Sequence, residues 1–189
     1  MLDGRGEVGV GLAGRHVAVG HPGAFSRFDG VLDRHLAEQA REAADCLEPL
    51  APYLAGDRLA LVKAASTELA TLAERLPLVY RHGDYETRNW LYDQDTGRHG
   101  LIDFSTAAPG VAATEFVWLC GAVWPTRTDL RDVYFTGYGR PLTGDEDRLL
   151  QLLTARLGAS YLRTGLAKQR EDLIQRGHLV LDRMAAHRR

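Results

Sequence analysis

The residues best suited to chemistry lie in one stretch near the middle of the 189-residue chain. A polar segment holds Asp84, Asn89 follows five residues later, and an apolar run ends in Asp103. Mg²⁺ takes oxygen ligands, usually one or two carboxylates beside phosphate and water. Phosphoryl transfer needs such a metal together with a carboxylate near the attacking hydroxyl. We therefore predict that Asn89 and Asp103 hold a magnesium–nucleotide and that Asp84 activates a hydroxyl.

Short strands are expected to present these side chains. Three apolar or strand-like runs cover residues 78–80, 89–92 and 100–103. The polar stretch between the last two runs contains Gly97, which predicts a β-hairpin. One carboxylate, one carboxamide and a second carboxylate would thus come from adjoining strands.

Helical periodicity dominates the rest of the chain. Thr143 and Glu146 form the pattern of a capping box, which marks the start of a helix. Apolar residues recur at helical spacing in several other segments. Helices are expected from residue 28 to residue 50 and over about 57–75, 112–123, 129–138, 143–162 and 166–187. The predicted fold class is α+β and mostly helical, around a small β element.

Composition narrows the classes of function. Apolar residues make up 45% of the chain and charged residues 25%, as in ordinary soluble globular proteins. The formal net charge of −2 argues against broad non-specific binding of nucleic acid. No apolar run approaches the ~18 residues of a membrane span, and no signal peptide is evident at the start. We expect a cytoplasmic protein with no membrane and no nucleic-acid partner.

The glycine-rich start of the chain contains a GxGxxG pattern at residues 9–14. A phosphate-binding loop of this type needs a preceding strand, and only two residues are available for one. The only lysines, Lys63 and Lys168, both fall in helical patterns. We interpret residues 1–27 as an irregular or partly helical lead-in and not as a phosphate-binding loop.

The central motif resembles a known family. His-Gly-Asp at residues 82–84, Asn89, and Ile-Asp-Phe at residues 102–104 follow the order of the catalytic and metal-binding segments of protein kinases. In detail this motif resembles the aminoglycoside phosphotransferase / choline kinase family, which has a protein-kinase-like fold. The resemblance implies that residues 28–189 form the C-terminal lobe of such a phosphotransferase and that the small hairpin is catalytic.

The resemblance also implies roles for individual residues. Asp84 would be the catalytic base, and Asn89 and Asp103 would bind Mg²⁺ and with it ATP or another nucleoside triphosphate. His82 would brace the catalytic loop. The chain departs from the family pattern at two places: Glu86-Thr87-Arg88 stands where many relatives have His-Pro-Gly, and Glu115 stands where relatives often have a loop-supporting Asp. Arg88 would pair with a nearby carboxylate or line the cleft.

These features together imply an ATP-dependent O-phosphotransferase that acts on a hydroxyl of a small molecule, either an antibiotic or a metabolite. The family's N-terminal lobe, with its glycine-containing strands and its ATP-binding lysine, has no counterpart in residues 1–27. Three explanations stay open: a truncated chain, a partner that supplies the lobe, or a chain that is not an active kinase. The alternative functions are a catalytically inactive kinase-like binding module and a metal-dependent phosphoesterase.

A consequence for the surface follows from the same resemblance. The face around the hairpin packs under the other lobe in relatives, so we expect an exposed apolar surface there and around the residues before Phe28. A partner or a second copy of the chain is expected to cover this face.

Overall fold

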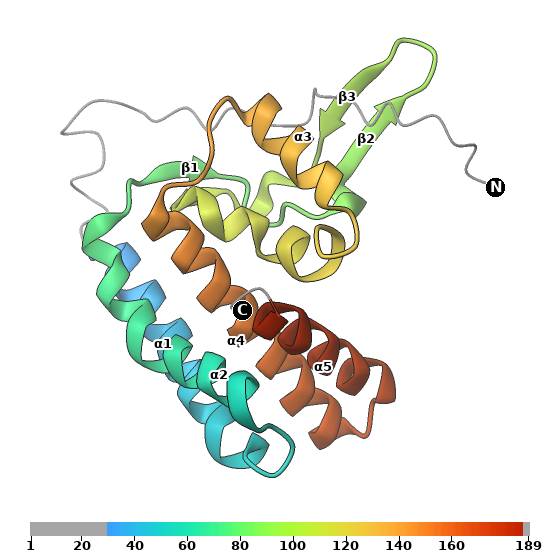
Figure 1. Cartoon of the computed structure of the whole chain (residues 1–189). Helices are drawn as coiled ribbons and strands as arrows, with labels where there is room; N and C mark the ends of the chain where they lie inside the picture. The colour runs from blue at the N-terminus through green and yellow to red at the C-terminus, as the bar shows by residue number, and fades with distance from the viewer. Residues whose placement is uncertain (1–29, 187–189) are drawn as a thin grey trace.

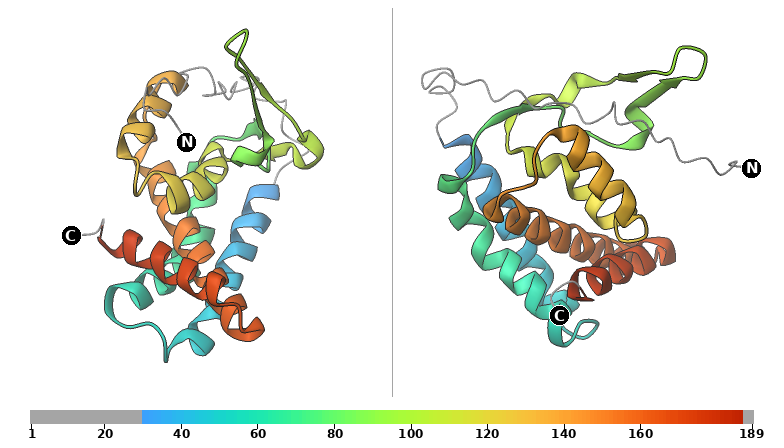
Figure 2. Two further views of the ribbon diagram at one scale, coloured as in Figure 1. Left: turned by 90° about the vertical axis from the view of Figure 1, so that its right-hand side faces the viewer. Right: turned by 45° about the horizontal axis from the view of Figure 1, so that its top comes forward.

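The structure, a computed structural model, describes residues 30–186 apart from the side chains at 31, 74 and 75 (Figure 1). The GxGxxG pattern and the predicted lead-in therefore lie outside the described residues, as does the apolar surface expected before Phe28. The described chain is mostly helical with two small antiparallel sheets, which agrees with the predicted α+β class. It forms a helical body with the short strands at one end (Figures 1 and 2).

Four helices make up the body. α1 (Val31–Leu50) and α2 (Gly56–Glu68) pack on one side of the long helix α4 (Gly144–Lys168), and α5 (Glu171–Ala186) packs against both α4 and α2. α4 can hold this central position because apolar residues follow nearly its whole length, from Leu149 to Leu162. Each such leucine buried from water contributes about 1.5–3 kcal/mol. α4 therefore connects the helical body to the end that carries the strands.

The core has two clusters of buried side chains that share α4. One lies toward the strands and centres on Phe116, which is fully buried among Leu149, Trp124 and Tyr138. The other lies between α1, α2, α4 and α5 and includes Leu162. The strand-bearing end of the molecule thus rests on a packed aromatic core and not on the short sheets themselves.

The predicted hairpin is confirmed. β2 (Trp90–Asp93) pairs antiparallel with β3 (Arg98–Leu101), with Trp90 opposite Leu101. β3 ends at Leu101, earlier than expected, so Asp103 lies beyond the strand and not at its end. The hairpin projects from the body in every view (Figures 1 and 2).

The prediction that the functional side chains come from adjoining strands is wrong. β1 (Val79–Arg81) does not pair with the hairpin; it pairs with β4 (Ala108–Gly110), which the sequence analysis did not predict. Tyr80 lies opposite Pro109 in this pair. Proline has no backbone N–H and an Ala-Pro-Gly segment has little strand propensity, so pairing with β1 defines this strand.

The helices after the hairpin differ in type and bounds from the prediction. The segment 112–123 is helical throughout but begins as the 3₁₀-helix η5 (Ala112–Phe116) and ends as the π-helix η6 (Leu119–Val123). α3 (Thr128–Tyr138) agrees with the prediction. In the segment 57–75, α2 gives way to the 3₁₀-helix η2 (Leu69–Arg75).

The capping box of α4 is confirmed, but the last helix begins later than predicted. Thr143 Oγ1 accepts the backbone N–H of Glu146, and the Glu146 carboxylate accepts the backbone N–H of Thr143. α4 continues through residue 166 to Lys168, and the chain turns at Gln169 in the left-handed conformation (φ 53°). α5 therefore starts at Glu171.

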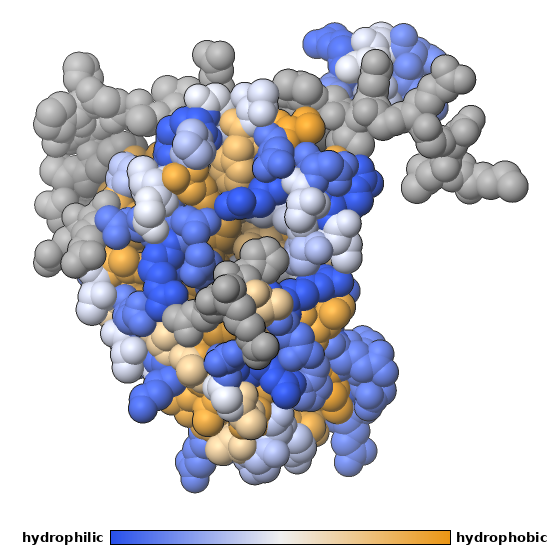
Figure 3. Space-filling view, in the orientation of Figure 1, coloured by the Kyte–Doolittle hydropathy of each residue, from blue (hydrophilic) through white to orange (hydrophobic). Residues whose placement is uncertain are grey.

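Large apolar residues are exposed around the hairpin, as expected for that part of the surface. Hydrophilic side chains cover much of the face shown in Figure 3, with apolar residues exposed between them. Of the eight large hydrophobic residues that the described part exposes, five belong to the segment 80–104: Tyr80, Leu91, Tyr92, Ile102 and Phe104. None of the helices within residues 30–186 is long and apolar enough to cross a membrane.

Candidate active site

The loop that follows β1 is built around Gly83. Its backbone has φ 90°, a conformation that side chains disfavour. A Cβ at this position would lie 2.3 Å from the carbonyl oxygen of Thr106. Thr106 Oγ1 also donates to the carbonyl oxygen of His82, at 3.3 Å. The loop that carries Asp84 and the segment after Asp103 are therefore in direct backbone contact, which only glycine at this position permits.

His82 joins the same two segments through its ring. The side chain is buried, and Nδ1 accepts the backbone N–H of Asp84 at 3.2 Å. Nε2 lies 2.8 Å from the carbonyl oxygen of Ile102 and donates to it, because Nδ1 already acts as the acceptor. The ring also packs edge-on against Phe104, with 4.5 Å between centroids. His82 thus contacts the residues on both sides of Asp103 as well as the backbone of Asp84.

Glu115 fixes the start of the loop by accepting hydrogen bonds from its backbone. It extends from η5 with a side chain that is 1% exposed. Its Oε2 accepts the backbone N–H of His82 at 2.8 Å, and its Oε1 accepts that of Gly83 at 3.0 Å. Arg81 Nη1 lies 3.9 Å from Oε1. Burial raises the pKa of Glu115, and the two backbone N–H groups and Arg81 oppose that rise by stabilising the carboxylate.

The Asp84 carboxylate is bonded on both oxygens. Arg88 Nη2 lies 2.7 Å from Oδ1 and 2.7 Å from Oδ2. Asn89 Nδ2 donates to Oδ2 at 3.0 Å and to the backbone oxygen of Asp84 at 2.8 Å. Arg88 also forms an ion pair with Glu86. Arg88 thus has the first of the two placements expected for it, and the Asp84 side chain, 25% exposed, is oriented between a cation and an amide.

Asp103 lies at an exposed bend after β3. Its backbone is left-handed (φ 64°, ψ 65°), which is uncommon for a residue with a side chain. Its Oδ1 accepts the Ser105 hydroxyl at 2.6 Å. The Ser105 hydroxyl lowers the pKa of Asp103, and the nearby positive charge of Arg88 lowers it further. Asp103 is therefore an ionised carboxylate directed by a tight local turn, close enough to Arg88 for their charges to interact.

The oxygen atoms at this site suit a magnesium–nucleotide. Asn89 is buried, its amide nitrogen is bonded to Asp84, and the Ile102 N–H donates to its backbone oxygen at 3.0 Å. Its side-chain oxygen and the Asp103 carboxylate are the donors that Mg²⁺ prefers. In the described part of the chain no three His, Cys, Asp or Glu side chains are placed to hold a metal. This donor set fits a metal that takes its other ligands from phosphate and water, not a closed metal cage.

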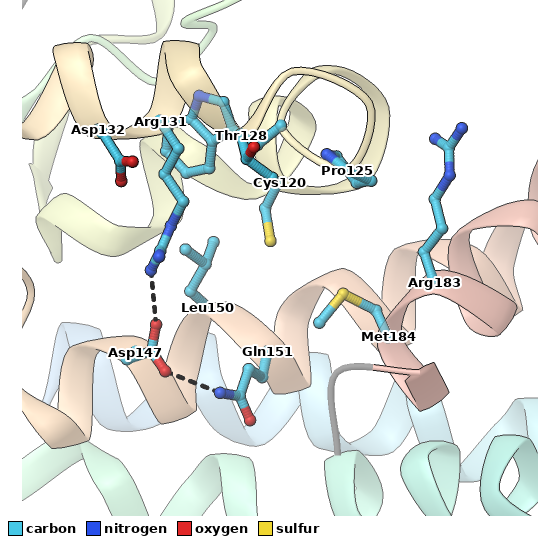
Figure 4. Close-up of a pocket in the computed structure, with 11 residues that line it drawn as sticks. Cys120, Pro125, Thr128, Arg131, Asp132, Asp147, Leu150, Gln151, Arg183 and Met184 are labelled. Atoms are coloured by element: carbon cyan, nitrogen blue, oxygen red, sulfur yellow. Dashed lines mark hydrogen bonds and ion pairs between the residues drawn. The ribbon is translucent and has the colours of Figure 1, made fainter. Parts of the chain in front are cut away.

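A separate pocket lies away from these residues, between the segment from η6 to α3 and the helices α4 and α5 (Figure 4). Its volume is about 320 Å³. Arg131 reaches across to Asp147 at 3.3 Å, and Gln151 donates to Asp147 at 2.7 Å. The Cys120 thiol points into the space above Leu150 and Met184 (Figure 4). None of the six predicted site residues lines this pocket.

The structure brings the six predicted site residues into one connected region and adds three that the sequence analysis did not single out. Arg81 supports Glu115, and Ser105 and Thr106 direct the segment after Asp103. Ser105 could have been suspected, because a serine two residues after an aspartate often bonds back to it. No local signal marks Arg81 or Thr106, because their partners lie more than 20 residues away.

Comparison with known proteins gives one family. The model of a family described as phosphotransferase enzymes matches residues 6–152. The matched region contains all six predicted site residues and ends within α4. Neither the comparison with curated proteins nor the comparison with solved structures gave a match.

Proposed function

This chain belongs to the phosphotransferase enzyme family, and from that premise we propose that it is an ATP-dependent O-phosphotransferase that acts on a hydroxyl of a small molecule, an antibiotic or a metabolite. One observation carries the proposal. His82 bonds the backbone of Asp84 and the residue before Asp103, so that the candidate base and a candidate metal ligand are held in one rigid arrangement. Such positioning is most of what phosphoryl transfer asks of a protein.

In the proposed reaction, Asp84 orients the acceptor hydroxyl and takes its proton. The hydroxyl oxygen forms a bond to the γ-phosphorus of ATP, the bond from that phosphorus to the oxygen it shares with the β-phosphate breaks, and ADP leaves. Asn89 keeps the Asp84 carboxylate oriented through its amide nitrogen. Its side-chain oxygen and Asp103 would hold Mg²⁺, which supplies charge neutralisation at the phosphates when bound.

We further propose that residues 28–189 are the C-terminal lobe of a protein-kinase-like fold, preceded by a lead-in over residues 1–27. The exposed side chains of Tyr80, Leu91, Tyr92 and Phe104 support this assignment, because a face that packs under another lobe is apolar. A partner or a second copy of the chain would cover this face.

Transfer of the γ-phosphate from Mg–ATP to a panel of aminoglycosides and amino alcohols tests the proposed function. Asp84→Asn keeps the shape of the side chain and removes the base, so transfer should fall about 10²–10⁴-fold. The control is Asp95→Asn in the exposed hairpin turn, which should leave transfer unchanged. No nucleotide binding at millimolar concentration, or full activity of Asp84→Asn, would refute the proposal.

A second candidate, a kinase-like module that binds ligand without turnover, is favoured by the distribution of lysines. The two lysines of the chain, Lys63 and Lys168, lie in α2 and at the end of α4, and both are exposed. Neither has contacts at the Asp84 site among the described interactions. Nucleotide binding by the wild-type chain with no transfer to any acceptor would identify this function.

A further inference from the structure

The exposed positive charge nearest to the candidate base belongs to Arg88. A nucleotide brings several negative charges to the site, and these need cationic partners. Arg81, the other arginine of this region, is mostly buried and faces Glu115. Arg88 is 60% exposed, and its guanidinium bonds Asp84 and Glu86 at the surface of the site. Of the described cations around Asp84, Arg88 is thus the one that a ligand from solvent can reach.

The backbone of Arg88 is fixed in a short turn, and its side chain is 60% exposed. The residue belongs to the short 3₁₀-helix η3 (Thr87–Asn89), directly before the buried Asn89. Asn89 N donates to Glu86 O at 2.9 Å, which closes this turn. The guanidinium extends from it to a point beside Asp84, and its charge also acts on Asp103. Arg88 therefore lies beside the candidate base and one residue before the candidate metal ligand Asn89.

The contact of Arg88 with Asp84 conflicts with the chemistry proposed for Asp84. Arg88 Nη2 engages both carboxylate oxygens, and Asn89 shares one of them. A carboxylate in this state has to release the guanidinium before it can accept a hydroxyl proton. Because the Arg88 side chain is 60% exposed, water screens this ion pair and lowers the free energy needed to separate it. The contact with Asp84 uses a single guanidinium nitrogen, whereas a phosphate group can accept from two nitrogens of the fork at once.

We propose that Arg88 is a nucleotide-binding residue with two positions: it holds the Asp84 carboxylate in the free protein and moves to a phosphate of the bound nucleotide. This inference rests on the proposed function. It assigns to Arg88 the positive charge that neither lysine of the chain is placed to supply. It also makes nucleotide binding the event that releases the base for the acceptor hydroxyl.

Isothermal titration of the purified full chain with a non-hydrolysable ATP analogue and Mg²⁺ tests the inference without any turnover. Arg88→Gln should weaken the affinity about tenfold or more, because a charge-assisted bidentate contact is lost. Arg88→Lys keeps the charge and should fall between wild type and Arg88→Gln. The matched control is Arg98→Gln, an exposed arginine in β3 of the hairpin, which should bind as wild type does.

The outcomes separate this inference from the proposed function. A wild-type chain that binds no nucleotide overturns both. Wild-type binding together with equal or tighter binding by Arg88→Gln overturns the role of Arg88 alone and leaves the proposed function standing. If Arg88→Gln fails to fold by circular dichroism, Arg88→Lys decides. A folded Arg88→Lys that binds the nucleotide more weakly than wild type supports the inference, and an affinity equal to wild type overturns it, because lysine cannot form the bidentate contact.

Discussion

Replacement of Glu115 by Ala should destabilise the protein through the loop that carries Asp84. The carboxylate accepts the backbone N–H groups of His82 and Gly83 and is almost fully buried. Without it both donors lose their partner, at a cost of about 1–3 kcal/mol each. Two terms offset part of this cost: the removed charge was itself penalised by burial, and water that enters the vacated space restores part of the bonding. We expect a net loss of about 2–4 kcal/mol in the free energy of unfolding.

Urea unfolding followed by circular dichroism measures this loss. The matched control is Glu68→Ala, which removes a partly exposed carboxylate paired with Arg148 and should cost under about 1 kcal/mol. A loss at Glu115→Ala no larger than that of the control would refute the reasoning, because it would mean that the two backbone donors do not depend on Glu115. A large loss in both variants would refute it as well, since burial would then not distinguish the two sites.

Two further predictions concern the same loop. Gly83→Ala should lower both the melting temperature and the rate of phosphate transfer, because the new Cβ would clash with the Thr106 carbonyl and the backbone φ is unfavourable for alanine. The control is Gly97→Ala, at φ 67° with open space around it, which should lower the free energy of unfolding by only about 1 kcal/mol. Because burial raises the folded-state pKa of Glu115, the stability that its protonated form contributes is present below the unfolded pKa and is lost as pH rises through the folded pKa. The unfolding free energy of wild type relative to Glu115→Gln should therefore fall as the pH rises above the ordinary pKa of glutamate, and a flat or rising difference would contradict this sign.

Local signals in the sequence predicted the parts of the fold that local interactions determine. The hairpin follows from a polar turn with Gly97 between two strand-like runs, and the start of α4 follows from the capping box of Thr143 and Glu146. The boundary between α4 and α5 was misplaced because Gln169 adopts a left-handed turn that is usually marked by glycine. The turn is closed locally, since the N–H of Arg170 bonds the carbonyl oxygen of Gly165, and α5 then packs back onto α4.

The site was predictable as a set of residues and not as a network of contacts. The motif places Asp84, Asn89 and Asp103 in one short stretch, and the structure brings that stretch together. The bonds from Glu115 to the loop join residues more than 30 positions apart, and the pairing of β1 with β4 depends on the position of the intervening chain. Contacts between residues so far apart in the sequence depend on how the helical body packs, and the spacing of apolar residues along the chain does not reveal that packing.

The β1–β4 pair also bears on how this protein could diversify. Val79 lies opposite Gly110, so the chain leaves the helical body and returns to it at neighbouring points, with every site residue except Glu115 between them. Extra residues in the hairpin turn between Asp93 and Arg98 would project outward and add only a small closure entropy, which grows slowly with loop length. The tip of the hairpin is therefore the position where insertions can accumulate and recruit new acceptors or binding proteins while Asp84 and Asp103 keep their geometry.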